Sequence, residues 1–170
     1  MFIFTASQSG AQVHYKSTID NQVDNAILRE HLNHEQLDEI AGRASGSIYA
    51  WGVTPGPRNV KLWSQMRPGD LAVAYREHSF RSLLRVTGTT HNEALAERLW
   101  GFGTTRDGKR ITWEYIYFLD KMAKFNVYSP RVYQGHTGPL DNKTADEILL
   151  KIEKTTGLRI PALAPSKVSV

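Results

Sequence analysis

The sequence predicts an α/β (α+β) fold, in which a mixed sheet is flanked by several short helices. Short runs of β-branched and aromatic residues alternate with segments of strong helix formers, and turns rich in glycine and proline separate them. At 170 residues with 41% hydrophobic content, the chain can bury one sizeable core but is short for two ordinary domains. We therefore expect one domain over residues 1–160, followed by a tail or linker at 161–170.

Strands are expected where apolar and aromatic residues cluster in short runs. The clearest run is 111–119, because it alternates in polarity and is rich in aromatic residues. A first strand at the N-terminus should deliver Ser7 and Gln8 to a loop. The other expected strands are residues 2–4, 13–16, 48–53, 71–75 and about 82–87.

Helices are expected after residues that commonly cap them. Asp20 or Asn21 precedes a helical apolar pattern that continues to about Ala41. Asn59 should cap a short helix that carries Trp63, and Asn92 should cap a helix that ends at Gly101. The last expected helix covers residues 145–155 and is capped by Asp141 or Thr144.

Composition excludes several classes of function. The chain has no cysteine, so disulfides, thiolate zinc sites and cysteine nucleophiles are impossible. It has no run of about 18 apolar residues, and the segment after residue 4 is polar rather than a signal-peptide core, so we expect a cytoplasmic protein without a membrane partner. Lysine and arginine number 21 against 17 acidic residues, and the resulting net charge of +4 favours a polyanionic partner.

No catalytic or metal signature stands out. His31 and His34 are three residues apart on an expected helix, a spacing that can bring two imidazoles to one metal. Charged residues surround both, so a solvated helix face fits better. There is also no Gly-x-Ser-x-Gly run to present a serine nucleophile. We expect no metal, no cofactor and no enzymatic activity in this chain.

The four tryptophans are the most informative side chains. Trp63 shares an apolar helix face with Met66 and should be part of the core. Trp51 is followed by a glycine and a proline-rich loop, which would leave its ring exposed at the rim of the sheet. There it could stack on a flat ligand, and base–aromatic stacking contributes about 1–3 kcal/mol per base. The alternative is an ordinary core position.

Four segments together resemble the central pattern of EVE domains, which are PUA-like relatives of the YTH domains that recognise methylated adenine. In that pattern a strand ends in tryptophan, asparagine opens a short helix, methionine precedes Gly-Asp, and the next strand ends in an aromatic residue. Residues 48–53, 58–59, 62–66 and 69–75 reproduce it in order. Residues 2–7 resemble the first YTH strand. Residues 92–101 and 112–116 resemble later parts of EVE modules from modification-dependent, Mcr-type restriction systems.

The resemblance implies a PUA-like fold, with a strongly curved sheet or open barrel, and a non-catalytic specificity module that holds a flipped, modified base in an aromatic cage. It places Trp51 in the cage, the backbone of Gly52 at one edge of the base and Ser7 or Gln8 at the other. Trp100 is the implied second wall, and Trp113 is a further candidate. Gly52 stands where YTH domains have serine or cysteine, so 6-methyladenine and 5-methylcytosine both remain candidate bases.

The implied partner is DNA with a modified base, together with the NTPase or nuclease domain or subunit of a restriction system. Modified RNA is an alternative ligand for the same pocket. A third reading is a small hydrolase or nucleotide-processing enzyme that uses His14, His78 or His136 with a carboxylate. The basic residues expected to contact phosphates are Arg58, Arg76, Arg81, Arg85, Arg106, Lys109 and Arg110.

Overall fold

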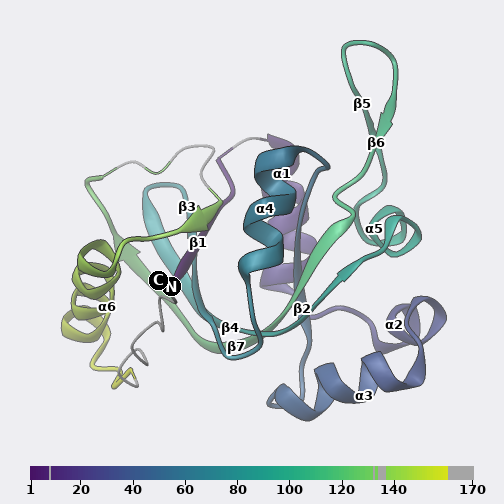
Figure 1. Cartoon of the computed structure of the whole chain (residues 1–170). Helices are drawn as coiled ribbons and strands as arrows, with labels where there is room; N and C mark the ends of the chain where they lie inside the picture. The colour runs from purple at the N-terminus through teal and green to yellow at the C-terminus, as the bar shows by residue number, and fades with distance from the viewer. Residues whose placement is uncertain (8, 132, 134–136, 161–170) are drawn as a thin grey trace, which may run out of the picture.

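A six-stranded mixed sheet forms the centre of the molecule (Figure 1). The computed structural model describes residues 1–7, 9–131, 133 and 137–160. Strand order is β2-β7-β4-β3-β1-β8; β1 and β3 pair in parallel, and the other neighbours pair antiparallel. The strands are β1 (Phe2–Thr5), β2 (Tyr49–Val53), β3 (Leu71–Arg76), β4 (Ser79–His91), β7 (Tyr115–Tyr128) and β8 (Gly138–Pro139).

The two longest strands, β4 and β7, give the sheet its strong curl. Their pairing shifts register between Phe80 and Ser82, between Leu83 and Leu84, and between Val86 and Gly88. Such bulges bend a strand and increase its twist. The sheet consequently curls strongly along its length (Figure 1).

Helices surround this sheet, and a small hairpin projects from it. The hairpin consists of β5 (Gly103–Thr104) and β6 (Arg110–Ile111) and extends away from the body of the molecule (Figure 1). Among the described residues, no helix combines the length and apolar content needed to cross a bilayer. The helices are α1 (Ser9–Tyr15), its π-helical continuation η1 (Lys16–Asp20), α2 (Asn25–His31), α3 (His34–Arg43), α4 (Pro57–Gln65), α5 (Glu93–Trp100) and α6 (Asn142–Thr156).

Capping signals located two helices well. The Asn92 side chain accepts a hydrogen bond from Leu95 N and opens α5, which ends at Gly101 as expected. Asp141 accepts from Thr144 N and opens α6. A polar side chain that satisfies the free N–H groups of a first turn is a local signal, so the sequence alone reveals it.

Three helix or strand predictions were wrong. Residues 13–16, expected as a strand, are helical, because Tyr15 and Ile19 lie four apart and both face the core. The single helix expected to about residue 41 is two helices, α2 and α3, since Asn33 opens a second one with a capping box. Asn59 is not a cap: α4 begins at Pro57, and the Asn59 amide donates to the Thr54 carbonyl at 3.0 Å.

Two strand boundaries also differ from the prediction. The expected strand at 111–119 corresponds to β7, which begins only at Tyr115 and continues to Tyr128. Residue Ile111 belongs instead to β6 of the hairpin. The expected strand at about 82–87 lies inside the longer β4. The expected tail at 161–170 lies outside the described residues.

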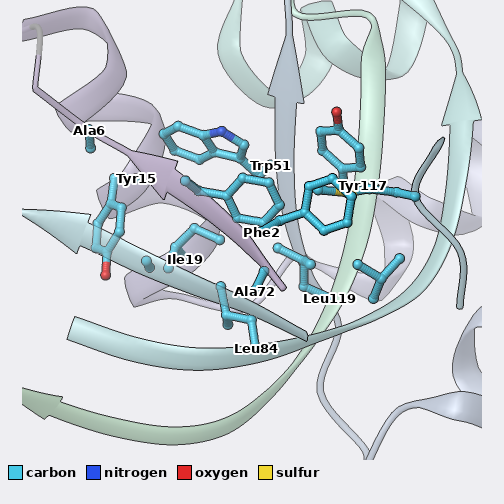
Figure 2. Packing of buried hydrophobic residues seen from close by; sticks show 13 residues of the cluster. Phe2, Ala6, Tyr15, Ile19, Trp51, Ala72, Leu84, Tyr117 and Leu119 are labelled. Carbon is cyan, nitrogen blue, oxygen red and sulfur yellow. The ribbon is translucent and has the colours of Figure 1, made fainter. Parts of the chain in front are cut away.

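The Trp51 side chain is buried, with 1% of its surface exposed, so the expectation of a ring exposed at the rim was wrong. Trp51 pairs with Tyr117 across β2 and β7, and its ring lies 6.2 Å from that of Phe4. Tyr15 from α1 covers it edge-on at 6.3 Å. Figure 2 shows the indole between Tyr15 and Tyr117 in the main hydrophobic cluster.

We predict that Trp51→Ala lowers the free energy of unfolding by about 3–5 kcal/mol, because truncating a buried tryptophan removes packing and leaves a cavity. Urea denaturation followed by circular dichroism measures this change. Tyr128→Ala is the control: Tyr128 is 65% exposed, and its loss should change stability by no more than about 0.5 kcal/mol. A Trp51→Ala protein as stable as the parent would show that the ring does not support the core.

Candidate functional site

A cavity of about 290 Å³ opens where β1 and β2 end. The starts of α1 and α4 and the loop before β7 complete its wall. Small-molecule sites in proteins commonly span roughly 300–1,000 Å³, so this cavity fits a ligand of about one or two rings. Its lining residues are Thr5, Ser7, Ala11, Trp51, Gly52, Val53, Thr54, Arg58, Asn59, Trp113 and Thr137.

Two tryptophans form the aromatic part of this wall. The rings of Trp51 and Trp113 are 5.2 Å apart at an angle of 78°, so they make a corner rather than a parallel pair. Trp51 is fixed by the core, whereas Trp113 is half-buried. Because only 1% of the Trp51 surface is exposed, a flat molecule in the cavity would lie mainly against the half-buried Trp113 ring.

Polar groups complete the wall at the ends of β1 and β2. Ser7 lies there, as expected, whereas Gln8 is outside the described residues. Asn59 fixes the neighbouring loop by donating to the carbonyl and hydroxyl oxygens of Thr54 at 3.0 and 3.3 Å. Arg58 is exposed, and its guanidinium has no ion-pair partner in the described part of the chain. The cavity therefore combines two indoles with hydroxyl groups and one positive charge.

Gly52 is the position at which the cavity wall is packed most tightly. A Cβ built on this residue would lie 2.4 Å from the Trp113 carbonyl oxygen and 2.7 Å from the Trp100 ring. Such distances are too short for any side chain, so glycine is required here for steric reasons. The close approach joins β2 to the two residues that flank the hairpin.

Trp100 does not line the cavity. Its indole packs against Gly52, lies 6.2 Å from the Trp113 ring, and donates from Nε1 to the Thr18 hydroxyl at 3.1 Å. This arrangement favours Trp113, rather than Trp100, as the second wall. The resemblance ranked Trp100 before Trp113, whereas in the fold it is Trp113 that lines the cavity.

No family model matches the chain, and no curated protein matches it. A solved structure is similar, however: the N-terminal domain of McrB from Thermococcus gammatolerans, which was solved bound to m5C DNA. The TM-score is 0.61 at 13% sequence identity, and the similarity covers 91% of this chain and 98% of that domain. The two chains share one fold.

The shared fold confirms the predicted fold class, a mixed and strongly curved sheet flanked by short helices. At 13% identity, the likeness to the N-terminal domain of McrB is a likeness of fold. The similarity covers most of this chain and nearly the whole McrB domain.

His14 packs against two of the tryptophans, Trp113 and Trp100. Its ring lies 4.2 Å from Trp113 in an edge-on contact and 5.7 Å from Trp100 in a stacked one. Burial lowers the pKa of His14 from its usual value, and a hydrogen bond with the Trp100 backbone opposes this shift only in part. Burial therefore favours the neutral form of His14, whose ring packs against two indoles.

The described histidines of the enzyme and metal hypotheses lie on different elements. His78 lies in the β3–β4 turn at a positive φ of 57° and His14 lies on α1, while His136 is outside the described residues. His31 ends α2 whereas His34 begins α3, so they do not share one helix face as the sequence suggested. Among the described residues, no three histidine, aspartate or glutamate side chains are placed to hold a metal ion.

Three of the expected phosphate-contacting arginines, which lie on strands of the sheet, are paired with acids. Arg85 contacts Asp120 at 2.7 Å, and Asp120 also accepts hydrogen bonds from the Ser45 backbone and hydroxyl. This carboxylate, only 3% exposed, thus ties the segment before β2 to β7 and β4. Arg76 pairs with Asp20 at 3.3 Å and Arg81 with Glu77 at 3.0 Å.

The other basic residues lie at the cavity wall or on the hairpin. Arg58 is at its wall, and Arg106, Lys109 and Arg110 belong to the hairpin that ends beside Trp113. Lys109 pairs with Asp107 at 3.2 Å, and Arg110 pairs with Glu97. Of the seven predicted residues, three therefore lie on the sheet and four lie at the cavity wall or on the hairpin.

We predict that Gly52→Ala destabilises the protein by about 1–3 kcal/mol, the usual range for forcing extra volume into a packed region. The added methyl must displace the Trp113 backbone or the Trp100 ring. Thermal unfolding compared with Gly42→Ala measures the effect, since a Cβ at Gly42 in α3 meets nothing within 4 Å. Equal melting temperatures for the two variants would contradict the close packing at Gly52.

The lowered pKa of His14 predicts a dependence of stability on pH. The ordinary pKa is 6.5, and the folded value lies below it, so the unfolded chain binds more protons as pH falls. The stabilisation is complete above pH 6.5 and is lost as pH falls through the folded pKa. His14→Gln should therefore show a smaller loss of stability between pH 7.5 and 5 than the parent. The exposed His34→Gln variant is the control, and its stability should fall between pH 7.5 and 5 by as much as that of the parent.

Proposed function

We propose that this chain is a non-catalytic DNA-binding module that holds a methylated base in the cavity between Trp51 and Trp113. The observation that carries the proposal is the position of that cavity, at one end of a sheet whose fold is shared with a domain solved on m5C DNA. The cavity has the size of one base and presents aromatic and polar surfaces together. These are the two requirements for binding a single base outside the helix.

The energetics of the cavity support a flipped base. Extruding a base from a duplex costs a few kcal/mol, and stacking on an aromatic side chain returns about 1–3 kcal/mol per base. In the proposed complex, Trp113 stacks on the base, Trp51 meets its side, and Ser7 and the backbone of Gly52 contact its edges. Arg58 contacts a neighbouring phosphate, which positions the DNA without distinguishing sequences.

DNA is the preferred ligand because the similar domain was solved on DNA, and 5-methylcytosine is the first base to test. The NTPase or nuclease activity of a restriction system would belong to another domain or subunit, and the module would act in the cytoplasm. The described contacts of the His14 ring are with Trp100 and Trp113 rather than with a carboxylate, so they do not support the enzyme hypothesis.

The deciding experiment measures affinity for otherwise identical duplexes that contain 5-methylcytosine, 6-methyladenine, 4-methylcytosine or no modification. Fluorescence anisotropy at a fixed salt concentration is the readout. We expect at least about tenfold tighter binding to one methylated duplex, equivalent to ~1.4 kcal/mol. Equal affinities for all four duplexes would contradict the proposal. A preference confined to methylated RNA would replace DNA by RNA as the ligand.

We predict that Trp113→Ala removes about 1–3 kcal/mol of binding, mostly from the preference for the methylated duplex. Its ring is half-buried, so stability should fall less than in Trp51→Ala. The matched control is Trp63→Ala. Trp63 packs on Tyr115 and donates to the Ile116 carbonyl, and it is not part of the cavity lining. It should lose stability while keeping the methyl preference. A Trp113→Ala protein that kept the parent's preference for the methylated duplex would show that Trp113 does not stack on the base.

A further inference from the structure

The β5–β6 hairpin originates at the wall of the cavity. Its two flanking residues, Trp100 and Trp113, both approach Gly52 so closely that no Cβ fits between them. The residues between them extend away from the body of the molecule (Figure 1). Anything bound with one group in the cavity therefore lies beside this hairpin.

Phe102 is a large apolar side chain exposed at the base of the hairpin, with 57% of its surface in contact with solvent. It comes two residues after Trp100, so at most about 7 Å of backbone separates the two Cα atoms. The Arg110 guanidinium lies over one face of the ring, 4.0 Å from its centroid, and Arg110 itself is held by Glu97 of α5. The ring is thus fixed on one face and open on the other.

The charge of the hairpin complements a polyanion. Residues 101–112 contain three basic side chains and one acidic one. Arg106 is exposed at the turn without an ion-pair partner among the described residues, and the Lys109 side chain is 80% exposed. An apolar ring beside exposed cations matches a DNA groove, in which phosphates flank stacked bases. A protein surface would not require the cations.

We infer, building on the proposed function, that Phe102 is a wedge that enters the base stack at the gap left by the flipped base. Removing a base from a duplex deprives its neighbours of their stacking partner, and apolar side chains inserted between base pairs replace that contact. The open face of Phe102 stacks on the base pair beside the gap. Arg110 holds the other face, and Arg106 and Lys109 contact the phosphates on either side.

A wedge contributes only when there is a gap to fill, and this defines the test. The probe is a duplex with one 5-methylcytosine opposite guanine, compared with the same duplex in which that nucleotide is an unpaired single-base bulge. When a bulged base enters the cavity, the flanking pairs restack on each other and no gap remains. The two probes therefore share the cavity contacts and differ in the need for Phe102.

Phe102→Ala should weaken binding to the paired duplex by about 5- to 150-fold, the range that stacking on one aromatic ring supplies. Binding to the bulged duplex should stay within about twofold of the parent. Phe102→Trp, which keeps a flat ring, should retain the parent's affinity for both probes. Tyr128→Ala, which removes an exposed aromatic ring at the opposite end of β7, should leave both unchanged.

If Phe102→Ala weakened binding to both probes equally, Phe102 would be a general DNA contact and not a wedge. No weakening on the paired duplex would overturn the wedge as well. Failure of the proposed function looks different: the parent protein would then bind methylated and unmethylated duplexes equally, whatever stands at position 102.

Discussion

The close contact at Gly52 is the constraint on which the site depends. Three parts of the chain meet there: strand β2, the end of α5 at Trp100, and the loop at Trp113, with no space for a Cβ. Because Gly52 follows Trp51 in the same strand, this contact sets the corner between Trp51 and Trp113 and, with it, the width of the cavity. It also fixes both ends of the hairpin, so the direction in which the hairpin projects is determined by the packing of the cavity wall.

Trp51 belongs to the core and to the cavity at once. Its ring is enclosed by Phe4, Tyr15 and Tyr117, yet part of the residue lines the space where we propose that a base binds. A wall made of a core residue does not have to be ordered when a ligand arrives, which lowers the entropic cost of binding. A substitution at Trp51 should therefore change both the stability of the fold and the proposed binding of a base. A substitution at Trp113, which is half-buried in a loop, should change binding more than stability.

Local signals in the sequence predicted much of the fold and part of the site. The capping asparagine and the glycine at its ends located α5, and apolar runs located β2 and β3, because each signal acts over a few residues. The burial of Trp51 could not be predicted, since its neighbours come from β1, α1 and β7. The sequence around Trp51 shows only a glycine and prolines. The preference for Trp113 over Trp100 also depends on tertiary packing, and so does the role of His14, which no motif indicated.

The distribution of charge narrows the path that DNA could take. A net charge of +4 suggests a broadly basic surface, but Arg76, Arg81 and Arg85 are held by Asp20, Glu77 and Asp120. Contact with a phosphate would have to compete with these ion pairs, and for Arg85 with a carboxylate that is nearly buried. Arg58 and Arg106 have no such competitor among the described residues, and they lie at the cavity wall and on the hairpin. The positive charge available to a phosphate backbone is therefore concentrated beside the cavity and along the hairpin. A duplex following that charge would bring its bases to the same end of the sheet as Phe102 and the Trp51–Trp113 corner.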